Sequence, residues 1–504
     1  MYLVHRELNL NSDVNRSLKR LFWLFIHSDK ELFLVGGCVR DLLLGKKPKD
    51  YDLCTNATPE EIKEILDTKY YHFIDTGLKH GTITVHDLID EQFYEITTYR
   101  IDGEYTDARH PSSVEFTKSL EEDLKRRDFT INSFAYNLIT EELIMLDKSF
   151  MDDLKFGIIR TVGRSTDRFK EDALRMLRAF RFAAQTGFSI DTETYEAIVE
   201  CAPLMANISK ERIRDELTKI LLSDNPRYLE LFVVSGVEKY SFDGKEPLKA
   251  ILTCEHQNPY HYTDVFHHTL DVVERVPKKF ELRWAALFHD MGKPYVKRLK
   301  EGTDDHYTYY GHDEKSTEIA LELMEILKFS NLTTNIIEKF VKFHDFNLAE
   351  CKMSTFKKVL REIGPENFLD FMKLREADSS AHCLLLQTKY AINHVAICYD
   401  RYKKVMKNPL TALEIKDLHI SGYELMQLGL KGKQVGDTLR ELLERVLENP
   451  DLNTNKILIH LAKEINDGKW RNWIIRPSRK LGKKYSITSW CCINWSSCSK
   501  NYYQ

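Results

Sequence analysis

The sequence lacks the features that identify disulfide-rich, zinc-ribbon, membrane-spanning and secreted proteins. Its ten cysteines form no CxxC pair and show no regular spacing, which argues against a disulfide framework or a zinc ribbon and fits a reducing, cytoplasmic location. Its longest apolar runs are far shorter than the roughly 20 residues that cross a bilayer, so we expect no membrane contact. The polar, mixed-charge residues 1–10 predict no secretory signal or transit peptide.

An excess of charge of one sign is missing as well. The formal net charge is −4, so the chain as a whole has no basic signal for nucleic acid, and any RNA contact must come from a local patch. Internal repeats and low-complexity blocks are not found either. A length of 504 residues is too great for one core and predicts roughly three domains.

The largest concentration of candidate functional residues lies in residues 32–52. An apolar run of strand character leads into two glycines, and the stretch ends on Asp50 and Asp52, which stand two apart. Alternate residues of a strand point to one face, and two carboxylates there are costly unless a cation lies between them. Hard oxygen ligands of this kind suit Mg²⁺, although an isolated DxD is equally compatible with a solvated acidic loop.

The residues between the strand and the acids favour a metal-dependent nucleotidyl-transfer site. Gly36 and Gly37 let backbone N–H groups approach a phosphate closely. Arg40 is placed to add charge-assisted contacts to the same phosphate. A glycine pair and an arginine at this distance from the DxD make the solvated loop the weaker interpretation.

Two segments downstream supply further candidates. Residues 73–87 and 92–100 alternate like an antiparallel pair of strands, and Glu95 in the second could be a third carboxylate ligand. Arg126 and Arg127, which we expect at the start of a helix, could grip a triphosphate or order a sugar. A surface basic pair is the alternative for these two arginines.

Asp172 and Arg175 stand three apart on a predicted helix and therefore share a face, which is also the spacing of an ordinary ion pair. Cytosine and adenine place an exocyclic amino donor beside a ring-nitrogen acceptor, whereas uracil and guanine present the reverse. An aspartate acceptor beside an arginine donor therefore complements C and A and opposes U and G. Arg178 and Arg181 continue at three-residue steps and could reach phosphate or hold the pair in place.

These segments resemble the motifs of the class II tRNA nucleotidyltransferases and bacterial poly(A) polymerases. The first motif, GGxVRDxxLG followed by DxD, is filled at every position: Gly36, Gly37, Val39, Arg40, Asp41, Leu44, Gly45, Asp50 and Asp52. Residues 126–132 match RRDFTIN without departure, residues 171–175 match EDxxR, and residues 211–216 look like a structural brace. The resemblance is nearly continuous from residue 33 to residue 222.

The resemblance implies untemplated addition of CCA to tRNA from CTP and ATP, with release of pyrophosphate. It assigns catalysis and Mg²⁺ binding to Asp50 and Asp52. It assigns nucleotide binding to Gly37, Arg40, Arg127, Asp172, Arg175, Arg178 and Arg181. A poly(A) polymerase or an A-adding enzyme is the alternative, although the loop at residues 105–111 and the glycine-flanked segment 77–82 look like the CCA-adding branch.

The second half contains the pattern H…HD…D, which resembles the HD phosphohydrolase superfamily. Its metal ligands would be His268, His289, Asp290 and Asp378. Imidazole and carboxylate together suit a transition metal or Mg²⁺. His312 and residues 344–345 could extend the site to two metals, which would activate water for phosphoester hydrolysis. A degenerate HD fold retained as a scaffold is the alternative.

These features predict an α+β protein: a small nucleotidyltransferase (polymerase β-like) head with a mixed or antiparallel sheet, followed by all-α neck, HD and C-terminal helical domains. The predicted bounds are 1–150 for the head, 151–240 for a nucleotide-recognition and RNA-binding neck, 250–405 for the HD domain, 410–484 for a tRNA-binding helical region and 485–504 for a disordered tail. The tRNA-binding region contains a basic patch of Arg471, Arg476, Arg479, Lys480, Lys483 and Lys484. We expect no obligatory protein partner. A phosphohydrolase whose first half only recruits RNA, and a non-catalytic RNA-binding module, are the other functions open to this sequence.

Overall fold

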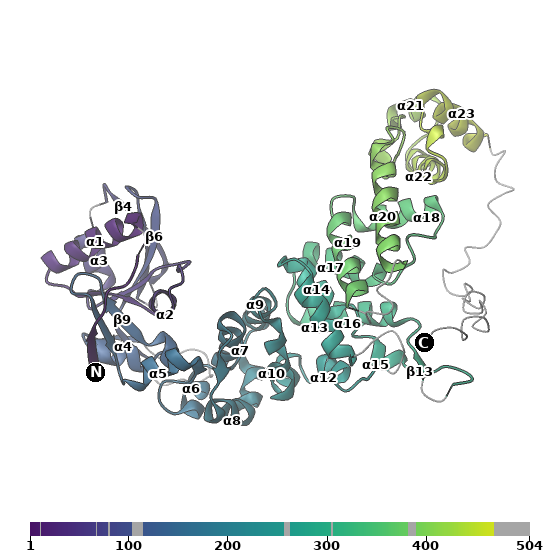
Figure 1. Ribbon diagram of the computed structural model, residues 1–504. Helices are drawn as coiled ribbons and strands as arrows, with labels where there is room; N and C mark the ends of the chain where they lie inside the picture. The colour runs from purple at the N-terminus through teal and green to yellow at the C-terminus, as the bar shows by residue number, and fades with distance from the viewer. Residues whose placement is uncertain are drawn as a thin grey trace, which may run out of the picture. The chain divides into compact units, whose positions relative to one another are not determined.

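The structure is a computed structural model, whose course is drawn in Figure 1. It describes residues 1–10, 12–66, 68–78, 81–102, 114–256, 263–303, 306–381 and 390–467. Backbone contacts divide the chain into two compact units, residues 1–350 with 362–399, and residues 351–361 with the chain from 400 onward. Within the described ranges, no helix combines the length and the apolar character that a membrane span needs.

The first unit begins with an eight-stranded sheet in the order β1-β10-β9-β2-β3-β6-β5-β4 (Figure 1). Its strands are β1 Tyr2–His5, β2 Leu32–Val35, β3 Asp52–Thr55, β4 Tyr71–Gly77, β5 Thr82–Asp87, β6 Gln92–Thr98, β9 Phe134–Asn137 and β10 Glu142–Met145. β3 and β6 run parallel and all other neighbours are antiparallel, which confirms the predicted mixed sheet. The prediction that residues 73–87 form one strand is wrong. Gly81 takes a φ of 74° in a turn, and the chain folds back so that β5 pairs antiparallel with β4.

The head also contains helices and a second, smaller sheet. They are α1 Ser12–His27, α2 Gly37–Leu43, α3 Pro59–Ile65, α4 Leu120–Lys125 and α5 Ser149–Phe156, and a small strand pair is β7 Arg100–Asp102 with β8 Val114–Phe116. The apolar stripe of α1 is fully buried at Leu18, Leu21 and Phe25. α3 begins with a capping box, in which Glu61 N donates to Thr58 Oγ1 at 3.3 Å and Thr58 N donates to Glu61 Oε2 at 2.8 Å.

The rest of the first unit is almost entirely helical, as predicted. The predicted neck contains β11 Ile158–Ile159, α6 Ser165–Glu171, α7 Leu174–Thr186, β12 Ser189–Ile190, α8 Thr192–Cys201, α9 Lys210–Leu221, α10 Leu229–Val234 and α11 Val237–Ser241, and α12 Pro247–Leu252 comes after it. The elements that follow are α13 Val265–Arg275, α14 Phe280–Phe288, α15 Lys293–Val296, β13 Arg298–Leu299, β14 Tyr307–Thr308, α16 His312–Ile326, α17 Asn331–Phe343 and α19 Phe368–Ser380.

The remaining helices lie wholly or partly in the second unit. They are α18 Met353–Ile363, α20 Tyr390–Lys407, α21 Gly422–Gln427, α22 Lys433–Glu448 and α23 Asn455–Asn466. The buried ammonium of Lys357 donates to the Leu447 carbonyl at 2.9 Å, which joins α18 to α22. The predicted basic patch and tail beyond residue 467, and the predicted loop at residues 105–111, lie outside the described residues.

Candidate active sites

The first acidic cluster lies where two parallel strands meet. Asp52 opens β3 and pairs in register with Glu95 of β6. Burial and the Glu95 carboxylate raise the pKa of Asp52 to about 6, while the Arg127 guanidinium opposes this shift and the Asp50 carboxylate adds to it. Asp50 lies in an exposed bend before β3, so strand alternation does not place the two carboxylates as predicted. A divalent cation relieves such crowding of acids, so these carboxylates fit a metal ion.

Gly36 allows the backbone to pass between two functional side chains. Its φ is 73°, in the left-handed region that favours glycine. A methyl group at this position would lie 3.2 Å from Nη1 of Arg127 and 3.7 Å from Oδ2 of Asp52. A side chain at position 36 would therefore crowd the Arg127 guanidinium, which lies close to the turn that leads into α2.

Arg40 on α2 is held by two neighbours. Its Nη1 donates to Oδ1 of Asn132 at 2.8 Å, and its Nε donates to Oδ1 of Asp41 at 2.9 Å. Asn132 closes a single 3₁₀ turn, residues 130–132, in the segment that matches RRDFTIN. Two predicted motifs thus meet through one buried guanidinium.

Arg126 and Arg127 stand at the end of a helix, and the prediction that they begin one is wrong. α4 starts after Ser119, whose hydroxyl accepts a hydrogen bond from Glu122 N, and it ends at Arg126. Acidic residues in the first turn and basic residues at the end both suit the helix dipole. The buried Asp123 carboxylate holds the two guanidiniums, with Nη2 of Arg126 at 2.6 Å and Nη2 of Arg127 at 3.1 Å.

The helix expected to carry Asp172 and Arg175 together is interrupted at Asp172. This residue has extended backbone, with φ −139° and ψ 103°. Its Oδ1 accepts from Leu174 N at 3.0 Å, at the start of α7, and its Oδ2 accepts from Nη2 of Arg212 at 3.0 Å. Because the break intervenes, the two residues do not share one helix face as predicted.

Arg175 is anchored by other groups instead. Its Nη1 donates to Oε2 of Glu171 at 2.5 Å and to the Arg168 carbonyl at 3.2 Å. Its Nη2 donates to the Arg126 carbonyl at 3.0 Å, which ties the EDxxR segment to RRDFTIN. The ordinary ion pair between Asp172 and Arg175, which their spacing allows, is therefore not formed.

Arg178 and Arg181 also have carboxylate partners. Nε of Arg178 donates to Oδ2 of Asp128 at 2.7 Å, and Nη1 of Arg181 donates to Oε1 of Glu216 at 2.9 Å. Burial opposes ionisation of Asp128, but Arg178 and then Arg175 lower the pKa of Asp128 to about 2. Both acids lie in motifs that the sequence analysis identified, but their pairing with Arg178 and Arg181 was not predicted.

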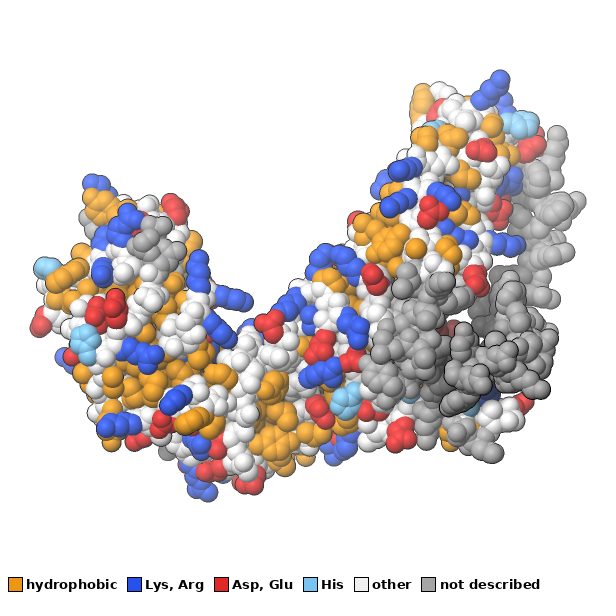
Figure 2. All heavy atoms as spheres, in the orientation of Figure 1, with side chains coloured by type: hydrophobic (Ala, Val, Ile, Leu, Met, Phe, Trp, Pro, Cys, Tyr) orange, Lys and Arg blue, Asp and Glu red, His pale blue; other side chains and the backbone are white. Residues whose placement is uncertain are grey.

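Residues from all of these motifs line one cavity. It has a volume of about 450 Å³ and is lined by Asp52 from the head and by Asp172 and Arg175 from the neck. Every residue predicted to bind nucleotide lines it, whereas of the two predicted metal ligands Asp52 lines it and Asp50 does not. Figure 2 shows basic, acidic and apolar side chains interspersed over the visible face. The arginines that line the cavity give it a positive potential for an anionic ligand.

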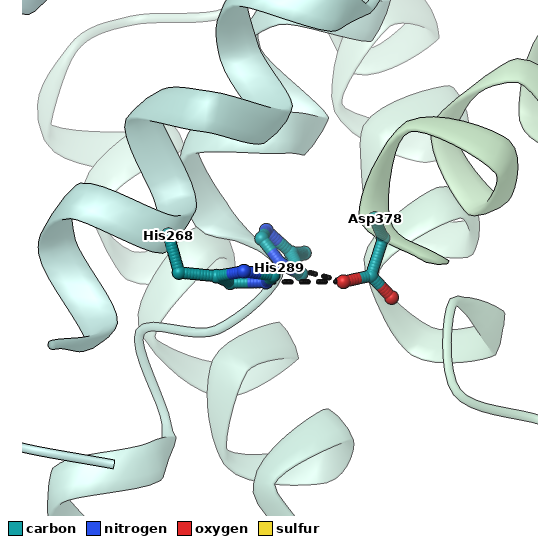
Figure 3. Close-up of side chains that lie close together, drawn as sticks. All are labelled: His268, His289 and Asp378. Atoms are coloured by element: carbon teal, nitrogen blue, oxygen red, sulfur yellow. Dashed lines mark hydrogen bonds and ion pairs between the residues drawn. The ribbon is translucent and has the colours of Figure 1, made fainter. Parts of the chain in front are cut away.

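A second cluster lies among the helices that follow the neck. Figure 3 shows the imidazoles of His268, from α13, and His289, which follows α14, facing the carboxylate of Asp378 on α19. Oδ1 of Asp378 lies 3.1 Å from Nε2 of His268 and 3.8 Å from Nε2 of His289. One ligand atom of each lies within 4.8 Å of the others, which is compatible with a shared metal ion.

Asp290 lies between this group and another. Its Oδ2 is 3.1 Å from Nε2 of His289, and its Oδ1 is 3.4 Å from Nε2 of His312 and 3.7 Å from Nε2 of His344. Asp290, His312 and His344 are buried and form a second set of potential metal ligands. Burial would raise the pKa of Asp290, but His289 and Lys293 hold it well below its usual range. The four residues predicted as one metal site therefore divide between two groups of potential ligands. Asp290 contacts residues of both groups.

Three segments of the chain match known families. Residues 32–160 match the family described as "Poly A polymerase head domain", residues 187–245 match "Probable RNA and SrmB- binding site of polymerase A", and residues 260–369 match "HD domain".

Known proteins are similar over larger parts. A CCA-adding enzyme of Leuconostoc mesenteroides is 47% identical over 211 residues, which cover 42% of this chain and 51% of that protein, so the chain spans about half of its length. A CCA-adding enzyme of Streptococcus suis is 37% identical over 320 residues, which cover 62% of this chain and 72% of that protein. The structure of the Bacillus stearothermophilus CCA-adding enzyme in complex with CTP is 26% identical, with a TM-score of 0.68, and the similarity covers 92% of this chain and 100% of that one.

Proposed function

This chain belongs to the family of CCA-adding enzymes, and from this premise we propose that it adds cytidine and adenosine nucleotides to the 3′ end of tRNA. In this reaction the 3′-hydroxyl of tRNA attacks the α-phosphate of CTP or ATP, and pyrophosphate leaves.

The observation that carries this proposal is the single cavity shared by Asp52, Asp172 and Arg175. A nucleoside triphosphate has its reacting phosphate at one end and its base at the other. A site that chooses the base without a nucleic-acid template must reach both ends with protein groups. The cavity brings an acid of the sheet and the acid and arginine of the neck within reach of one ligand.

Different residues of the cavity would bind different parts of the nucleotide. Gly37, Arg40 and Arg127 would hold the triphosphate and sugar, because they line the part of the cavity built from the head. Asp172 would accept the exocyclic amino group of C or A, and Arg175 would donate to the adjacent ring nitrogen. Uracil and guanine would place acceptor against acceptor and donor against donor.

We infer that the metal of this site is Mg²⁺, held by Asp52 and Asp50 with Glu95 beside them. Carboxylates beside substrate phosphates are the usual environment of Mg²⁺ in proteins. Burial and then the Glu95 carboxylate raise the pKa of Asp52 to about 6, and a bound cation would favour its ionised form. When bound, a divalent ion lowers the charge on the attacking and leaving oxygens.

The direct test uses labelled CTP and ATP with tRNA that ends at the discriminator base. We expect two C additions and one A addition when both nucleotides are present, and C addition alone when only CTP is given. Incorporation of ATP without any incorporation of CTP, either in long tracts or only on tRNA that already ends in CC, would support the poly(A) polymerase or A-adding alternative. No incorporation of either nucleotide would refute the proposal.

A second activity is favoured by the two histidine groups around Asp290. We propose that this HD domain binds divalent metal and hydrolyses phosphoesters. Buried imidazole and carboxylate ligands fit transition metals or Mg²⁺, and bound metal would supply a nucleophilic hydroxide from water. A phosphate-releasing activity of this kind is independent of nucleotide addition, so the two can be separated by mutation.

Asp290→Ala should remove most of the divalent metal that the HD domain binds, because Asp290 contacts both ligand groups. Hydrolysis of 2′,3′-cyclic nucleotides to nucleoside monophosphates, and phosphate release from those monophosphates, should both fall to background, while CCA addition changes by less than about twofold. His312→Ala should remove only part of the metal, since His312 belongs to one group. Metal content after dialysis, measured by mass spectrometry, checks both expectations.

Glu314→Ala is the matched control, because Glu314 is exposed on α16 two residues after His312. Its metal content and phosphate release should equal those of the wild type. Metal bound equally by wild type and Asp290→Ala would contradict the assignment of ligands. Metal binding without phosphate release from any phosphoester would instead support a scaffold role.

A further inference from the structure

One aromatic ring lies among three arginines of the nucleotide cavity. Phe182, on α7, lines the cavity and is only 6% exposed. The guanidinium carbons of Arg40, Arg178 and Arg181 lie over its ring, at 5.2, 5.3 and 4.3 Å from the centroid. A guanidinium within about 6 Å of an aromatic centroid is attracted by the negative face of the ring. A single side chain therefore interacts with three of the cations that a triphosphate would meet.

Each of these arginines also has an acidic partner. In the order above, the partners are Asp41, Asp128 and Glu216. The carboxylates hold the guanidiniums by hydrogen bonds, and each hydrogen bond uses one of the five N–H donors of its arginine. The aromatic ring adds attraction without using a donor, so the remaining N–H groups stay available to an anion.

Arg181 shows that the three cations are crowded. Burial, together with Arg178 and Arg40, lowers the pKa of Arg181 to about 10. Its Nε is buried and makes no hydrogen bond to any residue that the structure describes. A buried donor without an acceptor is costly, and the Phe182 ring, whose centroid lies 4.3 Å from the guanidinium carbon, attracts this cation. The ring thus offsets part of the cost of keeping like charges together.

We propose that Phe182 is a positioning residue for nucleotide binding, whose ring holds Arg40, Arg178 and Arg181 at the spacing that receives the triphosphate. This inference rests on the proposed nucleotidyl transfer. Because the ring acts through arginines that serve any nucleotide, its loss weakens binding of CTP and ATP alike and leaves the choice between bases unchanged. Packing is the competing role, since the ring also meets Phe129 edge-on at 5.7 Å.

Fluorinated phenylalanines separate these roles, because fluorine withdraws electron density from the ring with little change of shape. The full-length protein would carry mono-, di- or trifluorophenylalanine at position 182, and KM and kcat would be measured for CTP and ATP on tRNA lacking CCA. We expect KM for both nucleotides to rise stepwise to about tenfold, with kcat changed less than about twofold. The thermal unfolding temperature should stay constant along the series.

Phe180 is the matched control, because it lies on the same helix, is fully buried and does not line the cavity. The same fluorinated series at position 180 should leave KM unchanged. Phe182→Leu should raise KM, and Phe182→Tyr should restore it. A flat KM along the series at 182, or an equal rise at 180, would overturn the positioning role. A wild type that incorporates neither CTP nor ATP would refute the proposed function itself, a result that is read before any variant is made.

Discussion

Asp52→Ala should abolish addition of both C and A, with kcat/KM lowered by at least about 10³-fold. Asp52 is the predicted metal ligand that lines the cavity, and it lies beside Glu95 in the sheet. Charge stabilisation by a divalent ion contributes several kcal/mol, and each 1.4 kcal/mol or so corresponds to a tenfold change in rate. Single-turnover incorporation of labelled CTP into tRNA lacking CCA, and of ATP into tRNA ending in CC, measures the loss at each step.

A matched variant shows whether the effect is specific to this acid. Asp75 lies on β4 of the same sheet, with its side chain 47% exposed in an ion pair with Lys63. Exposed ion pairs contribute little, so Asp75→Ala should retain wild-type activity. An Asp52→Ala protein that incorporates CTP at the wild-type rate would show that the acidic cluster is not catalytic.

The head could be predicted from sequence because its local signals agree with its tertiary contacts. The apolar run at residues 32–35 forms a strand buried at every position, and the glycines after it take the turn that their lack of a side chain allows. Thr58 and Glu61, three residues apart, form a capping box. In each of these cases the deciding interactions lie within a few residues of the chain.

Other features depend on partners that spacing does not reveal. The apolar period runs on from α6 into α7, yet the chain breaks at Asp172, whose carboxylate is held by Arg212 from forty residues away. The sequence allowed a second metal at His312 and residues 344–345, but it could not show that Asp290 groups with His312 and His344, which follow it at the start of α16 and just after α17. The exposed strand β1 pairs with β10 although its residues have no buried face to mark them.

The contacts of Arg175 refine how the base would be chosen. Three of its five N–H groups go to Glu171 and to the carbonyls of Arg168 and Arg126. Among the described residues, no acceptor is recorded for its Nε–H and its second Nη2–H. These remaining donors could therefore donate to an acceptor on the edge of a base. The break at Asp172 therefore leaves both the acid and the arginine with capacity for a ligand, which an ion pair between them would have used.

Arg175→Ala should lower the preference for CTP over UTP, and for ATP over GTP, by about 10- to 100-fold, because a good bidentate base contact supplies about 1–3 kcal/mol of discrimination. The ratio of kcat/KM values on one variant cancels any general damage from losing the contacts to Glu171 and the Arg126 carbonyl. Arg164→Ala, which removes an exposed arginine outside the cavity, should leave that ratio unchanged. If Arg175→Ala slowed all four nucleotides equally, the arginine would be a clamp between the two motifs, and the base would have to be read by other groups.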